Sequence, residues 1–265
     1  MGIVPGPPPL RFFGPAAPPC WGVLLTVVAA LRRLGAGVLW FGGLPVWGHD
    51  TAVQKAGYIM GDAYQRDTTA WELAQTDRPL ARAFTGYRAA DQYGGLLFLS
   101  AAVYRYLGGE THHPLLMVVL MAAISALAVQ FAWAFARRLF DEEVAKWVAW
   151  GMALYPEAVL LGSSQMREAL MMTFAAIAFY GLARYRVASS RNDLPEKAES
   201  VTTNHSRVGL GFVLFALLLT LPLSPPLAVI LLSLLGIVGL GMDDWRIVRN
   251  WRLWAVLGGV GLAAA

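Results

Sequence analysis

Two aspartates, Asp62 and Asp91, have the sequence surroundings that best suit acid–base chemistry. They lie 29 residues apart, each is followed two positions later by a tyrosine, and each stands where a charged loop meets apolar sequence. A carboxylate that is partly buried at a membrane surface binds protons more tightly, so it accepts one from a hydroxyl group more readily. The alternative interpretation is that both are solvated loop charges.

The stretch around Asp62 is unusually rich in charge. GDAYQRDTTAWELA, residues 61–74, holds four charged side chains in fourteen, in a chain of which only 14% is charged. Residues 49–93 together carry six acidic, five basic and six aromatic side chains. Flexible linkers are normally poor in aromatic residues, so we expect 49–93 to be an ordered extracytoplasmic loop. Ala63, Ala70, Trp71 and Ala74 have helical spacing, which predicts a helix lying in the membrane interface.

Long apolar stretches place these charges beside a membrane. The chain has 265 residues, of which 57% are hydrophobic. Several stretches could cross about 30 Å of hydrocarbon, where lipid leaves backbone groups no partner except those that a helix supplies. The predicted fold class is all-α, a polytopic transmembrane helical bundle of about seven membrane helices, at 21–47, 114–135, 144–161, 169–183, 208–221, 227–242 and from 253 onward.

The chain divides into a Pro-rich N-terminal segment, residues 1–20, and a single membrane-embedded domain, residues 21–265. The first segment does not resemble a cleaved signal peptide. The sequence stops inside an apolar run, VLGGVGLAAA, as a C-terminally truncated chain would. The net charge of the chain, +4, is small, and its basic residues sit at helix ends where they meet lipid headgroups. We therefore expect no nucleic acid partner.

Lys and Arg positions predict the topology. Arg137 and Arg138 and the connection 184–207 should be cytoplasmic, which leaves 162–168 on the outer side. An odd number of crossings must then separate the outer loop from Arg137, yet two apolar segments intervene. The first, 94–107, is only about 21 Å long as a helix, so we expect it to be re-entrant or lodged in the outer half of the membrane. The alternative is that it spans, with Arg137 and Arg138 outside.

Four stretches between residues 57 and 185 carry a resemblance to a known enzyme superfamily: GDAYQRDTTAWELA, DQYGGLLFLSAAVYRYLGG, FARRLF and ALYPEAVLLGSSQMREAL. In order and spacing they look like the N-terminal module of the integral-membrane glycosyltransferases of the GT-C superfamily. The similarity is to the branch that includes protein O-mannosyltransferases and lipid A aminoarabinose transferases. It implies a multi-pass enzyme of the plasma (inner) membrane that needs no cofactor and uses a polyprenyl-phosphate sugar as donor.

The resemblance implies catalytic roles for Asp62 and Asp91. In that family an Asp after the first membrane helix is catalytic, and a second acidic residue starts the next helix. Here Gly94 and Gly95 replace the family's prolines, and Gln92 stands where a Lys is often found. The implied reaction is an inverting transfer, in which an acceptor hydroxyl or amine activated by Asp62 attacks the anomeric carbon and the polyprenyl phosphate leaves. The sugar, the carrier and the acceptor, whether lipid, glycan or protein, stay open.

A guanidinium beside the departing phosphate would stabilise the transition state of such a transfer. Arg167 is the first candidate, since the expected topology puts QMRE on the side of the two aspartates, although Arg167 could also merely mark a helix end. Arg66, one turn from Asp62, is the second, and a simple i,i+4 ion pair is its alternative. The resemblance assigns no role to Asp67 or Glu72. The predicted substrate-binding residues are Arg66, Gln92, Tyr93, Gln165, Arg167 and Glu168.

Other functions have less support. His112 and His113 fit no metal-ligand spacing, and Asp243 and Asp244 are better interpreted as helix-end charges, so we predict no metal site. Walker, dinucleotide-binding and GxSxG motifs are missing from the sequence. The rival function is a transporter or flippase of lipid-linked intermediates, which should carry ionisable residues in mid-span, where only Arg32 and Arg33 lie. A non-catalytic membrane scaffold is the third possibility.

Overall fold

The structure, a computed structural model, describes residues 20–48, 50–189 and 199–239. Several expectations fall outside these residues. They concern the Pro-rich segment, the basic residues between 190 and 198, Asp243 and Asp244, and the apolar run from 253. The described ranges contain helices and no strands, which confirms the all-α prediction.

The helices follow one another with short connections. In chain order they are α1 (Cys20–Trp47), α2 (Ala52–Lys55), α3 (Gly61–Ala74), the 3₁₀ helix η1 (Leu80–Phe84), α4 (Gly95–Leu107), α5 (Pro114–Leu139), α6 (Glu142–Leu154), α7 (Pro156–Ser163), α8 (Arg167–Ser189), α9 (Glu199–Leu223) and α10 (Pro225–Gly239).

Some boundaries differ from the sequence prediction for identifiable reasons. The apolar run 144–161 is two helices, because Pro156 lacks an N–H and the residue before a proline is pushed out of the helical region. Tyr155 accordingly has φ −55° and ψ 116°. The connection predicted at 184–207 is shorter, since α8 continues to Ser189 and α9 begins at Glu199.

By length and composition, two described helices could cross a membrane, Trp21–Trp47 and Pro114–Leu139. The pair α7 and α8 adds a third if it forms one span bent by 117°. The described apolar parts of α4, α9 and α10 are shorter, each between 10 and 17 residues. The structure thus supports a membrane-associated helical protein with two or three candidate spans.

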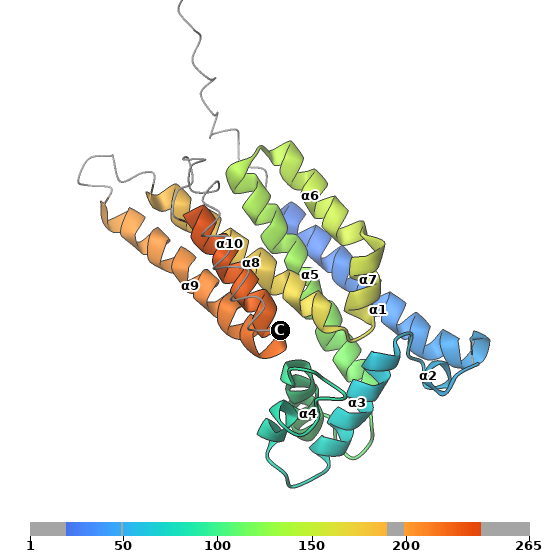
Figure 1. Cartoon of the computed structure of the whole chain (residues 1–265). Helices are drawn as coiled ribbons and strands as arrows, with labels where there is room; N and C mark the ends of the chain where they lie inside the picture. Colours follow the sequence, from blue (N-terminus) through green and yellow to red (C-terminus); the bar gives the residue numbers. More distant parts are fainter. Residues whose placement is uncertain (1–19, 49, 190–198, 240–265) are drawn as a thin grey trace, which may run out of the picture.

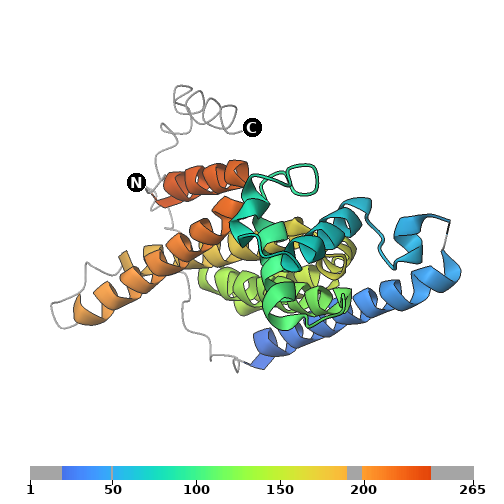
Figure 2. The ribbon, with the colours of Figure 1, turned by 90° about the horizontal axis from the view of Figure 1, so that it is seen from below.

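Helix α5 lies at the centre, where it packs against α1, α6 and α8, while α9 packs along α8. One apolar cluster joins α4, α5, α8 and α9 through residues such as Leu97, Met117 and Leu170, and a second joins α1, α5 and α6. Figure 1 shows α3 and α4 at one end of the bundle and the α5–α6 connection at the other. Seen from below, α1 and α10 occupy opposite flanks (Figure 2).

Helix α4 is held at the end of the bundle by two glycines and an arginine. Gly94 has φ +77°, and a Cβ there would lie 2.3 Å from the Ala83 carbonyl oxygen. A Cβ on Gly95 would lie 2.2 Å from the carbonyl oxygen of Pro222 in α9. Arg105 of α4 donates to carbonyls at the end of α3 (Leu73 and Ala74) and just after it (Thr76 and Arg78). The two glycines therefore meet a steric demand of this chain.

We expect α5 to separate two faces of a membrane. In a Cys20→Ser chain, cysteines introduced at Asp77 and His113 should react with an impermeant thiol reagent from one side, and one at Glu143 only from the other. All three positions are exposed. The 26 residues of α5 rise about 39 Å, enough to cross the hydrocarbon. Labelling of all three from one side would show that α5 does not cross.

Candidate functional site

Asp91 lies at the start of α4 and is 3% exposed. Its Oδ2 accepts hydrogen bonds from the backbone N–H groups of Leu96 (3.1 Å) and Leu97 (3.0 Å), in the first turn of the helix. Its Oδ1 lies 3.9 Å from Nη1 of Arg167 and has no hydrogen bond among the described residues. A carboxylate at a helix N-terminus is stabilised by those amides, so one oxygen of Asp91 fixes α4 and the other faces Arg167.

Arg167 is the first residue of α8 and reaches three other side chains. Its Nε lies 3.5 Å from Oε1 of Glu168, and its guanidinium lies 5.3 Å from the centroid of the Tyr93 ring. Its side chain is 24% exposed. Arg167 is therefore ordered by Asp91, Glu168 and Tyr93 while part of its side chain stays exposed.

Arg66 comes to the same place from α3. It is 6% exposed, and its Nη1 donates to the backbone oxygen of Gln165 at 3.3 Å. Its Nε is buried without a hydrogen-bond partner in the described chain. Burial lowers the pKa of Arg66, and the charge of Asp91 opposes that effect more than any other group does. A buried cation with unused donors is the kind of group that an anion could satisfy.

The turn between α7 and α8 places Gln165 and Arg167. Gln165 has φ 57°, a left-handed conformation that is strained for a residue with a side chain. Its side-chain Nε2 donates to the carbonyl of Pro114 at 3.0 Å, which ties the turn to the start of α5. The chain thereby reverses direction, and the Gln165 carbonyl lies against Arg66.

The structure brings together most of the residues predicted for the site. Arg167 contacts Asp91, Tyr93 and Glu168, Arg66 contacts Gln165, and the charge of Arg66 interacts with those of Asp91, Arg167 and Glu168. Asp62 is exposed on the first turn of α3 and acts on Arg66 through its charge. Gln92 is exposed beside Tyr93 and makes no hydrogen bond to these residues. Their chemical roles stay predictions.

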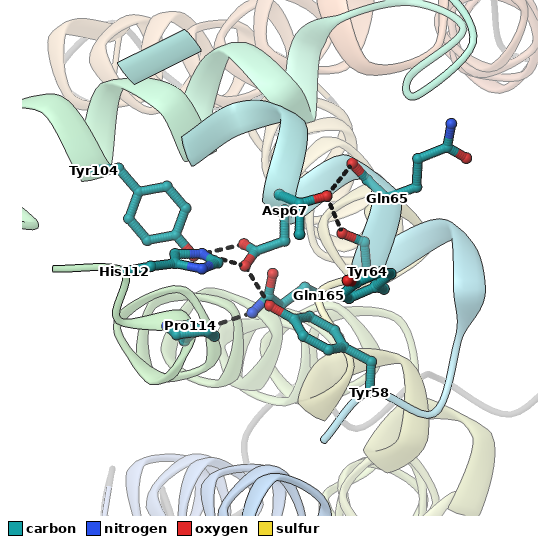
Figure 3. A network of polar contacts seen from close by, with 9 residues as sticks. Tyr58, Tyr64, Gln65, Asp67, Tyr104, His112, Pro114 and Gln165 are labelled. Carbon is teal, nitrogen blue, oxygen red and sulfur yellow. Dashed lines mark hydrogen bonds and ion pairs between the residues drawn. The ribbon is translucent and has the colours of Figure 1, made fainter. Parts of the chain in front are cut away.

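Sequence reasoning missed Asp67, whose carboxylate is the centre of a buried network (Figure 3). Its Oδ2 accepts from the hydroxyl of Tyr58 at 2.5 Å and lies 2.9 Å from Nε2 of His112. Its Oδ1 accepts from the hydroxyl of Tyr104 at 2.5 Å. The network thus joins the segment before α3, α3 itself, α4, and the α4–α5 connection.

The environment of this network explains its arrangement. Burial, followed by the charge of Asp67, raises the pKa of Tyr58, which keeps that hydroxyl a donor. The His112 ring stacks on Trp71 with centroids 5.2 Å apart, so one face of the ring is covered. A signal was present in the sequence: Asp67 falls four residues after Ala63 and three before Ala70, on the helix face that buries both alanines. An Asp on a buried face needs donors from neighbouring elements.

Metal ligation finds no support in the described part of the chain, where no group of three or more His, Cys, Asp or Glu side chains could hold an ion. The two adjacent histidines have separate partners. His112 contacts Asp67, and Nε2 of His113 lies 2.6 Å from the Thr111 hydroxyl.

Comparison with known proteins identifies no family. No protein-family model, curated protein or solved structure matches the chain. The class of protein that the observations define is therefore an all-helical, membrane-associated protein with a cluster of buried and half-buried charges at one end of its bundle.

Replacing Asp67 with Asn should destabilise the fold. The amide keeps one acceptor oxygen but directs an NH₂ at hydroxyl and imidazole donors. The free energy of unfolding should therefore fall by at least about 2 kcal/mol. In detergent, the Tm should fall by roughly 4–8 °C. Glu72→Gln, at an exposed position of the same helix, is the matched control and should change Tm little. Equal Tm values for the two variants would contradict the role given to Asp67.

Proposed function

We propose that this protein is a membrane glycosyltransferase of the GT-C type. It transfers a sugar from a polyprenyl-phosphate donor to a lipid, glycan or protein acceptor at the outer face of the plasma (inner) membrane. The observation that carries the proposal is the pair of arginines, Arg66 and Arg167, gathered with Asp91 and Asp62 at one end of a bundle of apolar helices. Two guanidinia there suit the phosphate of a donor whose lipid tail lies in the membrane.

The membrane arrangement that accompanies this proposal is a multi-pass one, with residues 49–93 outside. With α4 at the end of the bundle, only α5 separates that segment from Arg137 and Arg138. This supports the interpretation that 94–107 does not span, in an arrangement with those arginines on the cytoplasmic side. Helices α6 and α7 lead from those arginines to the turn at Gln165, and the hydrogen bond from Arg66 to that turn supports an outer location for both in the proposed arrangement.

Asp62 and Asp91 have different roles in the proposed reaction. The acceptor hydroxyl or amine gives its proton to the exposed carboxylate of Asp62 while its oxygen or nitrogen bonds to the anomeric carbon. The bond from that carbon to the phosphate oxygen breaks, and the polyprenyl phosphate leaves with the electron pair, stabilised by Arg167 and Arg66. Asp91, with Oδ2 occupied by helix amides, positions Arg167 and α4. Tyr93 orders Arg167, and the exposed amide of Gln92 is free to bind substrate.

A transporter is the rival function, and Arg33 is the residue that favours it. Arg33 is 1% exposed in the middle of α1, and its Nε donates to the Ala158 carbonyl at 3.3 Å. A transport path would need further ionisable groups along it. Apart from Asp67, which lies within α3 at the end of the bundle, the described carboxylates lie in the connections or near helix ends, which favours the enzyme.

Asp62→Asn should lower the transfer rate about 10²- to 10⁴-fold, the usual contribution of a general base. Size and hydrogen-bonding capacity are kept, and the side chain is exposed, so expression and Tm should stay near those of the parent. The measurement is transfer from labelled polyprenyl-phosphate sugars by the full-length protein in native membranes. Glu72→Gln, on the same helix, is the control. Undiminished transfer by Asp62→Asn would remove Asp62 from the reaction.

Arg167→Gln should lower transfer about 10²- to 10³-fold by removing a cation from the departing phosphate. Arg167→Lys keeps the charge but lacks the paired donors of a guanidinium, so the transfer rate should fall less than in Arg167→Gln. Arg137→Gln, at the opposite end of α5, is the control. Equal transfer rates for Arg167→Gln and Arg137→Gln would argue against a donor phosphate at this site.

A further inference from the structure

Arg32 is an exposed cation in the middle of α1. In the described chain it has no hydrogen bond, ion pair or ring contact. Its neighbour Arg33 turns inward and donates to the Ala158 carbonyl. The cost of an unpaired charge that faces lipid depends on how deep in the membrane the charge lies.

Two tryptophans give one measure of depth. Trp21 and Trp40 are 19 residues apart on α1, about 29 Å along the axis, close to the thickness of the hydrocarbon layer. Tryptophans are enriched at the two membrane surfaces. Arg32 then lies about 16 Å from the level of Trp21 and about 12 Å from that of Trp40.

Helix α5 gives an independent measure. A Cβ on Gly162 would lie 2.7 Å from Cδ of Arg33 and 2.7 Å from the hydroxyl oxygen of Ser125, so the Arg33 side chain reaches the level of Ser125. Ser125 is the twelfth of the 26 residues of α5. Both measures put the arginine pair near the middle of the membrane.

The Arg32 side chain cannot readily leave this depth. Side chains on a helix lean toward its N-terminus, which directs Arg32 toward the Trp21 end, the more distant of the two surfaces. That distance exceeds the length of an arginine side chain, so the guanidinium remains in hydrocarbon. An ionised group there is costly unless it meets an opposite charge.

The surface beside Arg32 is apolar and open. Leu24, Val27, Leu31 and Val38 recur at helical spacing, and each is between 49% and 63% exposed. Gly35 lies in the same stripe, and a Cβ there would meet no atom within 4 Å. Small and aliphatic side chains of this kind let a second helix approach closely in lipid.

We propose that this face of α1 binds a transmembrane helix of another protein, one that carries an Asp or Glu near its midpoint opposite Arg32. Charge complementarity argues for this partner over a second copy of the chain. The described candidate spans have carboxylates only near the ends of α7 and α8, at Glu157 and Glu168, so two copies would bring arginine to arginine. The inference rests on α1 crossing the membrane and is independent of the transfer reaction.

The test is photocrosslinking in the cells that make the protein, with p-benzoylphenylalanine at Leu31 of the full-length chain. An adduct should form with a protein whose crosslinked helix has a mid-span carboxylate. Arg32→Leu should lower its yield at least about tenfold, and Arg32→Lys should retain most of it. Arg32→Glu should lose the adduct, and exchanging the partner's carboxylate for Arg should restore it.

The matched control is the same crosslinker at Leu127, an exposed position on α5, whose adducts should be unchanged by Arg32→Leu. Four results would overturn the proposal: an adduct at Leu31 that is insensitive to Arg32→Leu, an adduct within the chain or to a second copy, a partner helix without a mid-span carboxylate, or adducts with lipid alone.

Discussion

The buried carboxylate of Asp67 is the constraint on which the end of the bundle depends. A charge removed from water must be met by donors, and Asp67 meets them on Tyr58, Tyr104 and His112. Those donors fix the rotation of α3 about its axis. Successive residues of a helix point about 100° apart, so holding Asp67 inward also sets the direction of Arg66, the residue before it. The position of the Arg66 guanidinium in the candidate site thus follows from the hydrogen bonds that hold Asp67.

The other side of the site is fixed by backbone geometry. The left-handed Gln165 reverses the chain between α7 and α8, and its side chain anchors the turn on α5. Strain of this kind persists only where the surroundings impose it, and Arg66 uses the carbonyl that the turn presents. Opposite, Asp91 holds α4 through its first amides and faces Arg167. The two arginines are therefore positioned by separate elements that meet only in the folded chain.

Sequence reasoning recovered the helical class and a helix at α3, because those depend on local composition and spacing. Three of the residues that it selected, Asp91, Tyr93 and Glu168, contact Arg167, while their chemical roles stay predictions. It missed Asp67, because the three donors that make it important lie 9, 37 and 45 residues away in sequence. It did not foresee the break at Tyr155, although Pro156 gave the signal. It predicted about seven spans where the described residues hold two or three candidates, since hydropathy does not distinguish a span from an apolar helix buried by its neighbours.

The three aspartates of this region differ in how many of their lone pairs are free, and that difference decides what each can do. Both oxygens of Asp67 accept from side chains, so its carboxylate serves structure. Asp91 has one oxygen on helix amides and the other 3.9 Å from a guanidinium, so a proton placed on it would weaken the contact that orders Arg167. Asp62 is exposed and its oxygens are uncommitted within the described chain, yet it is still within electrostatic reach of Arg66. A general base for the proposed transfer must accept a proton without dismantling its own site, and of these three aspartates Asp62 is the one whose contacts meet that requirement.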